Sequence, residues 1–256
     1  MICSIIRKGR FRMAAFLSLM LLFGSMDLDE IAADLHLETG MALMQQGLLE
    51  QAEREFMEAL EIGGEYHSAL LGLGMINFRR SSWTAAADYF HRYIQARPDD
   101  HRGYQELAAL YLRTGRPDSA RMMSDSAFVR SPSLPSIWLL CGKVQLELGD
   151  LASAADWFSR GMLDGGSTSL ESLVLLASVY RRTGRGQEAR ELLMPAVERG
   201  YAPACWELAR VYLEWNDYMR ATDAIQRYLM LSPSGYYADS ASLVLQELGE
   251  SGEYME

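Results

Sequence analysis

The sequence has few of the residues that form metal sites or activated nucleophiles. Its 256 residues include four histidines and three cysteines. No two histidines form an H-x3-H pair and no two cysteines form a C-x2-C pair, so a metal site is not indicated. The chain also lacks the G-x-S-x-G turn, the phosphate-binding loop and the dinucleotide glycine pattern. We therefore predict that the protein is not an enzyme and binds no metal or cofactor.

Positive charge is also scarce. Lys and Arg number 24 against 34 Asp and Glu, which gives a net charge of −10. An acidic chain repels the phosphates that dominate nucleic-acid binding, and it repels anionic membrane surfaces. We therefore expect no nucleic-acid partner, and we attribute the negative charge to solubility.

The apolar run near the N-terminus is short. Residues 13–26 contain no charge, whereas a membrane span needs about 20 apolar residues. Basic residues precede the run and acidic residues follow it, which is the pattern of a secretory signal peptide over residues 1–25. The basic residues are Arg7, Lys8, Arg10 and Arg12, and the acidic residues are Asp27, Asp29 and Glu30. Loss of residues 1–25 would change the net charge from −10 to −14.

Two alternatives stay open for this segment. Cleavage after Gly24 or Ser25 would leave Leu22 or Phe23 at an upstream position that prefers a small side chain, so an uncleaved N-terminal anchor is one alternative. Translation from Met13, which removes the basic residues, is the other. No cysteine directly follows the run, so a lipoprotein anchor is not supported. We expect export to the periplasm, or anchoring at the inner membrane facing outward, and membrane contact only through that anchor.

Small residues recur every 34 positions along the rest of the chain. The two series are Gly40, Gly74, Ala108 and Gly142, and Ala52, Ala86, Ala120 and Ala154. The period then slips slightly and continues with Ala177 and Ala189, then Ala209 and Ala221. Self-similarity at this period indicates an array of helix pairs, each of which buries its apolar face against its neighbours.

Residues 101–134 show what one unit contains. The first helix has one apolar face, made of Tyr104, Leu107, Ala108 and Tyr111. Gly115 and Pro117 then break the helix. The second helix is expected to bury Ala120, Ser124, Ala127 and Phe128, and it ends before Pro132. A small residue is needed where the two helix backbones approach closely.

These units resemble the tetratricopeptide repeat family, whose motif is W-x2-L-G-x2-Y, then A-x3-F, then P. The second unit reads Leu70-x2-Leu73-Gly74-x2-Asn77, Ala86-x3-Phe90 and Pro98. Other copies begin at His36, Tyr104, Trp138, Leu173 and Cys205, so six matches extend from about Ala33 to Gly235. The resemblance implies an all-α fold, a right-handed α-solenoid of antiparallel helix pairs with a C-terminal solvating helix.

We expect one solenoid domain over residues 33–248. Its repeats lie near residues 33–66, 67–100, 101–134, 135–169, 170–201 and 202–235, with a closing helix at 236–248. Glycines such as Gly200 end the units that lack the closing proline. The fourth and fifth units, of 35 and 32 residues, predict a locally irregular array. Residues 249–256 form an acidic tail with no apolar period, which we expect to be frayed.

The cysteines are not placed to form a disulfide. Cys141 and Cys205 fall on core positions of the fourth and sixth units, with a whole repeat between them. We expect buried thiols that pack as small hydrophobes. Cys3 lies in the N-terminal segment, and His36 takes a packing position.

In the resembled family the first helices line a concave side that commonly holds a peptide. The expected partner-binding residues of the first units are therefore Leu37, Met41, Leu71, Met75, Phe78, Arg79 and Arg113. Methionine is flexible and suits an adaptable apolar binding surface. The alternative is that other parts of the chain cover these apolar residues, either the segment next to the expected signal peptide or neighbouring repeats in a more tightly wound superhelix.

The later units bring positive charge to the same face through Lys143, Arg181, Arg182 and Arg210. Charge of one sign in a concave wall favours an acidic segment or a free carboxylate of the partner. The alternative is that these side chains pair with their neighbours Glu147, Glu171, Glu207 and Glu214. The Lys/Asn/Arg clamp of chaperone-tail-binding members is not matched, because its positions hold Leu37, Met41 and Gly72.

Trp206 is expected on the concave side, on the first helix of the sixth unit, and Arg210 lies one turn further along the same helix. Both residue types are frequent binding hot spots, so Trp206 is a candidate anchor. The alternative is that a closing helix around Tyr236 and Tyr237 covers it.

Together these features predict an exported interaction scaffold or adaptor of the cell envelope. It would bind a protein or peptide partner, for which an acidic segment is one candidate. The alternative is a self-assembling structural component of an envelope complex.

Overall fold

The computed structural model describes residues 28–63, 67–164 and 166–250. These residues form thirteen α-helices and one short 3-10 helix, with no β-strand among them. The expected all-α fold is confirmed. The expected signal peptide or anchor at residues 1–25, with Cys3, lies outside the described residues, as do residues 251–256 of the expected tail.

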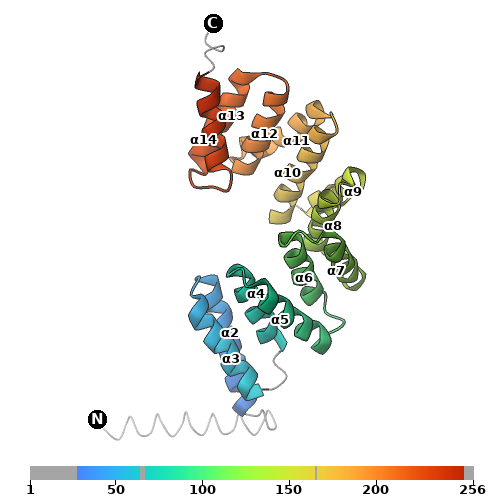
Figure 1. Ribbon diagram of the computed structural model, residues 1–256, viewed down its shortest axis with the longest axis vertical. Coiled ribbons are helices and arrows are strands. Elements are labelled where there is room, and N and C mark those ends of the chain that lie inside the picture. Colours follow the sequence, from blue (N-terminus) through green and yellow to red (C-terminus); the bar gives the residue numbers. More distant parts are fainter. Residues whose placement is uncertain (1–27, 64–66, 165, 251–256) are drawn as a thin grey trace, which may run out of the picture. The chain divides into compact units, whose positions relative to one another are not determined.

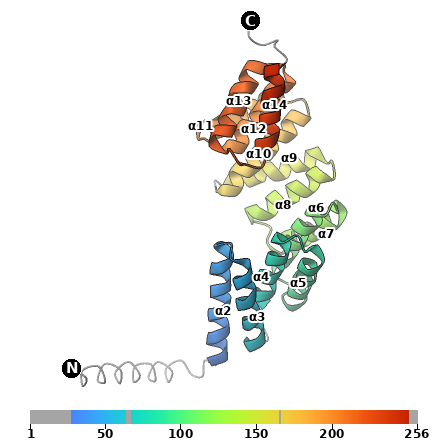
Figure 2. The same ribbon diagram turned by 60° about the vertical axis from the view of Figure 1, so that its left-hand side comes forward.

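Twelve of these helices follow one another in six pairs, each joined by a three-residue turn (Figures 1 and 2). The pairs are α2 (Leu28–Gln45) with α3 (Leu49–Gly63), α4 (His67–Arg79) with α5 (Trp83–Ala96), α6 (His101–Arg113) with α7 (Pro117–Arg130), α8 (Pro135–Glu147) with α9 (Leu151–Gly161), α10 (Ser167–Arg182) with α11 (Gly186–Glu198), and α12 (Ala202–Glu214) with α13 (Tyr218–Leu231). The last helix is α14 (Ala238–Glu250). The expected breaks at Gly115 and Pro117 and before Pro132 are confirmed.

The chain divides into two compact units, residues 1–110 and 111–256. In the first unit α2 packs on α3, α3 on α4 and α4 on α5, and α2 also contacts α4. In the second unit the helices from α7 to α14 pack in chain order, and α10 also contacts α8 and α12. The first helices of these successive repeats thus touch one another, α2 with α4, α8 with α10 and α10 with α12, as stacking requires. A single solenoid domain over residues 33–248 stays a prediction.

Each of the six turns holds one residue in the left-handed backbone region. Four of these are glycines, namely Gly47, Gly115, Gly149 and Gly184. Ser81 (φ 59°) and Asn216 (φ 55°) take the same place in the other two turns, where a Cβ makes the conformation less favourable. Gly200 (φ 76°) follows α11, as expected for a glycine helix stop.

Three repeats place a glycine of the first helix against a phenylalanine ring of the second. These pairs are Gly40 with Phe56, Gly74 with Phe90, and Gly142 with Phe158. A Cβ at Gly142 would lie 2.6 Å from Cδ1 of Phe158, and all three rings are fully buried. The expected reason for a small residue at the helix crossing is confirmed. The equivalent positions of the last two repeats hold Ala177 with Leu193 and Ala209 with Ile225.

The closing helix α14 packs on α13 and begins two residues later than expected. Its Ala241 is fully buried, and Val244, Leu245 and Leu248 pack against the core of the sixth repeat. The helix ends at Glu250, so residues 249 and 250, which were expected to belong to the frayed tail, are helical.

The fourth and fifth repeats contain irregular features. A 3-10 turn at Met162–Asp164 follows α9. Pro195 lies inside α11, where it has no backbone N–H to donate to the helix ladder. The sequence pattern did not point to either feature.

Cys141 and Cys205 are buried free thiols, as expected. Burial raises the pKa of the Cys141 thiol to about 11, which keeps it protonated and unreactive at neutral pH. Among the helices that the structure describes, none is both long and apolar enough to cross a membrane.

Candidate functional site

The apolar candidates of the first unit differ in how much surface they offer. Met41 on α2 is 40% exposed. Leu37 and Met75 are partly buried, and Leu71 belongs to the buried interior. Of these four candidates, Met41 therefore offers the most surface and Leu71 the least.

Phe78 and Arg79 are the last two residues of α4. The Phe78 ring meets the ring of Trp83 edge to face, with 5.5 Å between the ring centroids. Arg79 is exposed, and its Nη1 donates a hydrogen bond to the backbone oxygen of Met44, 3.0 Å away. The bond ties α4 to α2 and leaves part of the guanidinium facing solvent.

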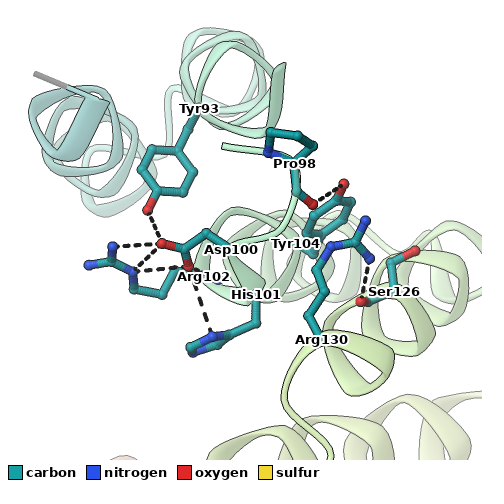
Figure 3. Close-up of polar contacts among 8 residues, drawn as sticks. All are labelled: Tyr93, Pro98, Asp100, His101, Arg102, Tyr104, Ser126 and Arg130. Carbon is teal, nitrogen blue, oxygen red and sulfur yellow. Dashed lines mark hydrogen bonds and ion pairs between the residues drawn. The ribbon is translucent and has the colours of Figure 1, made fainter. Parts of the chain in front are cut away.

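A polar cluster that the sequence pattern did not reveal surrounds Asp100, just before α6 (Figure 3). The Tyr93 hydroxyl donates to Oδ2 of Asp100 at 2.7 Å. Arg102 donates its backbone N–H to Oδ1 at 2.9 Å and its Nη2 to Oδ2 at 2.7 Å. His101 Nδ1 lies 3.9 Å from Oδ1. Asp100 thus caps the first turn of α6 and fastens it to Tyr93 of α5.

The electrostatics of this cluster indicate a structural role. Partial burial raises the pKa of Asp100, but hydrogen bonds from Arg102 and Tyr93 outweigh it and hold that pKa well below its usual range. Burial, together with the bond to Asp100, raises the pKa of Tyr93 to about 12. An open hollow adjoins the loop from Ala96 to Arg102. Of the charged residues that line it, Asp100 and Arg102 already bind each other.

A charge network joins α10 to α12 in the second unit. Arg181 donates Nε to Oε1 of Glu207 at 2.7 Å and donates Nη1 to Glu214. Arg210 donates Nη1 to the other oxygen of Glu207 at 3.1 Å. The side chains of Arg181 and Glu207 are 7% and 5% exposed, whereas that of Glu214 is 47% exposed. The network therefore has a buried centre and an exposed edge.

One hydrogen-bond donor of this network is left over. Nη2 of Arg181 is buried and has no hydrogen-bond partner among the described residues. Burial lowers the pKa of Arg181, but the two carboxylates raise it more, so the guanidinium stays charged. An unpaired donor on a buried cation is costly, because hydrogen bonds to charged groups are the strong ones.

The other cationic candidates divide into paired and exposed side chains. Lys143 Nζ lies 2.6 Å from Oε1 of Glu171. The expected alternative of glutamate pairing therefore describes Lys143, Arg181 and Arg210. Arg113 and Arg182 are exposed and have no ion pair among the described residues.

Trp206 is 8% exposed, so the structural alternative describes it better than a role as binding anchor. Its ring stacks on that of Tyr237 at 5.5 Å and meets that of Tyr228 at 6.0 Å. Tyr237 lies in the turn before α14, so the closing segment covers Trp206.

No group of three or more His, Cys, Asp or Glu residues in the described parts of the chain is arranged to hold a metal ion. His36, the candidate packing residue, pairs through Nδ1 with Oε2 of Glu55 at 2.7 Å.

Three proteins illustrate what the chain is similar to. Cellulose synthase 2 operon protein C of Komagataeibacter xylinus is 28% identical over 203 residues, which cover 77% of this chain and 14% of that protein. Lipopolysaccharide assembly protein B of Escherichia coli strain K12 is 25% identical over 166 residues, 63% of this chain and 43% of that protein. The chain thus spans less than half the length of both relatives.

A solved structure shows the same fold. That of PilW, a widely conserved type IV pilus biogenesis factor, superimposes with a TM-score of 0.71 and 15% identity. The superposition covers 82% of this chain and 98% of that chain.

Family models described as tetratricopeptide repeat match residues 37–101, 106–165 and 169–200, more than half of the chain. The matched ranges contain helix pairs with the three-residue turns and small crossing residues seen in the structure. The chain therefore belongs to the tetratricopeptide repeat family.

Proposed function

We propose that this protein is a non-enzymatic scaffold or adaptor that binds a protein or peptide partner on the faces of its first helices. The observation that carries the proposal is that these faces keep exposed side chains suited to binding. Met41, Arg79, Arg113 and Arg182 all belong to first helices and are exposed. Methionine adapts to apolar partners and arginine is enriched at binding hot spots.

Two observations support a location in the cell envelope. The basic residues and the uncharged run at 13–26 have the pattern of a secretory leader. The names of two relatives refer to a cellulose synthase operon and to lipopolysaccharide assembly. We place the protein in the periplasm, or at the inner membrane facing outward if the leader is retained.

Export is tested by fusing a reporter after Asp29. The native leader should carry the reporter across the inner membrane. Replacement of Leu19, Leu21 and Leu22 by charged residues should stop this, because an apolar segment is required for export. A reporter that stays cytoplasmic with the native leader contradicts the proposed location.

Partner binding is tested by capture from the native envelope with three forms of the protein. The forms are wild type, Met41→Glu, and the control Met230→Glu, which changes an exposed methionine on the second helix α13. A partner retained by wild type and control but lost with Met41→Glu supports binding on the first helices. A partner lost equally with both variants, or with neither, places binding on another surface.

Exposed apolar residues on the first helix favour self-assembly as a second candidate. Ile31 and Leu35 lie on α2, and both are exposed. Such a face could meet another copy of the chain. Size-exclusion chromatography with light scattering separates the two candidates, since a monomer favours the adaptor. An oligomer that Leu35→Glu dissociates favours assembly.

A further inference from the structure

We propose that Arg181 is a receptor for a carboxylate of the partner, and that Glu214 of the same chain occupies this receptor in the free protein. The inference rests on the proposed function and names the chemistry of the partner. Its starting point is the buried Nη2 of Arg181, which has no hydrogen-bond partner among the described residues.

The geometry of the guanidinium determines what it can still bind. Oε1 of the buried Glu207 accepts a hydrogen bond from Nε of Arg181 at 2.7 Å and fixes the orientation of the guanidinium. Glu214 accepts only from Nη1. A carboxylate prefers to take two parallel N–H groups of one guanidinium. A partner carboxylate that replaced Glu214 could take Nη1 and Nη2 together, which Glu214 does not do.

Glu214 is suited to be displaced. It is the last residue of α12, and its side chain is 47% exposed. Once released, it can return to water without burying a charge, and ion pairs with an exposed partner are weak. Glu207 differs in both respects, since it is buried and also binds Arg210 at 3.1 Å.

The local charge favours an acidic segment. Arg181 and Arg210 balance Glu207 and Glu214 within the network, in a chain whose net charge is −10. Displacement of Glu214 leaves an excess of one positive charge in the network. A local field opposite to that of the whole protein attracts a carboxylate to this place rather than to the rest of the surface.

The test compares Glu214→Gln with Glu147→Gln. Glu147 is the last residue of α8, as Glu214 is of α12, and it is exposed with no ion pair among the described residues. Both variants remove one negative charge, so they control for net charge. The probe is a fluorescein-labelled hexaglutamate peptide, with hexaglutamine as its neutral counterpart, measured by fluorescence anisotropy at low salt.

Glu214→Gln should bind hexaglutamate about tenfold more tightly than wild type or Glu147→Gln, because the competing charged hydrogen bond is gone. Hexaglutamine should show no such gain. Adding Arg181→Lys to Glu214→Gln should cancel it, since an ammonium lacks the planar fork. Thermal melting of each variant confirms that it is folded.

Equal affinities of Glu214→Gln and Glu147→Gln overturn the inference. They would mean that an ordered water satisfies Nη2 and that the network is structural. A gain that survives Arg181→Lys also overturns it. These outcomes leave the envelope capture with Met41→Glu unaffected, so the proposed function can stand without the carboxylate receptor. Absence of any captured partner would instead count against the function itself.

Discussion

The crossing of Gly142 with Phe158 allows a quantitative test of how the repeats are packed. A Cβ at position 142 would lie 2.6 Å from Cδ1 and 3.0 Å from Cζ of Phe158, well inside the roughly 3.5–4.0 Å preferred by carbon atoms. Phe158 is fully buried and cannot turn into solvent. Overpacking of this kind costs about 1–3 kcal/mol. Alanine recovers up to about 1 kcal/mol of helix propensity relative to glycine. We therefore expect Gly142→Ala to destabilise the protein by about 1–2 kcal/mol.

A double-mutant cycle isolates the contact itself. Phe158→Leu alone should cost about 1–2 kcal/mol through lost apolar burial. In the double variant the new methyl group occupies space that the ring vacates, as at Ala177 with Leu193. The double variant should therefore be more stable than the sum of the single changes predicts, by about 1 kcal/mol or more, in urea unfolding followed by circular dichroism. Additivity within about 0.5 kcal/mol would refute the argument, because independent sites behave that way.

Three further predictions concern stability. Trp206→Ala should cost about 3–5 kcal/mol of unfolding free energy, and clearly more than the control Trp215→Ala, since Trp215 is 41% exposed; similar melting temperatures would contradict the buried role. Ser81→Gly should stabilise the protein by about 0.5–1 kcal/mol, because it relieves left-handed strain at the expense of a more flexible unfolded chain. Asn216→Gly should gain less, since asparagine tolerates this region, and a larger gain in chemical unfolding would reverse the reasoning. The pKa of Asp100 is lowered on folding, so its contribution to stability is complete above its unfolded pKa of about 4 and is lost as the pH falls further. Asp100→Asn should therefore flatten the acid side of a stability–pH profile, and an unchanged slope below pH 4 would contradict this.

The helix pairs could be predicted because their signals are local. Gly115 and Pro117 sit within one turn of the break that they cause. The 34-residue spacing of small residues reflects the helix crossing, which lies within a single repeat. A sequence pattern records such contacts directly, because both partners recur at a fixed distance along the chain.

The surface of the candidate site could be predicted only in part. Helical periodicity places Trp206 on a face, but burial depends on what another segment lays over that face, here Tyr237. For the same reason the sequence left open whether Arg181 is free or paired. Its partners lie 26 and 33 residues away, and only the stacking of α10 on α12 selects them.

The sequence did not predict the Asp100 cluster because its two main residues give little signal in the sequence pattern. Tyr93 and Asp100 are seven residues apart, across the end of α5, and neither belongs to the repeat motif. An acidic residue just before a helix is a recognised capping signal, and it would have been the cue for the helix start. The hydroxyl that binds it has no comparable signal.

The glycine–phenylalanine crossings bear on how such a chain can grow. Both members of a pair, such as Gly74 and Phe90, lie inside one repeat, sixteen positions apart. Duplication or deletion of a gene segment that begins and ends between repeats therefore keeps each ring with its own glycine. An insertion or deletion between the two members of a pair would instead set the ring against a residue chosen for a different neighbour. The crossings thus allow the array to lengthen or shorten by complete repeats while every remaining crossing stays matched.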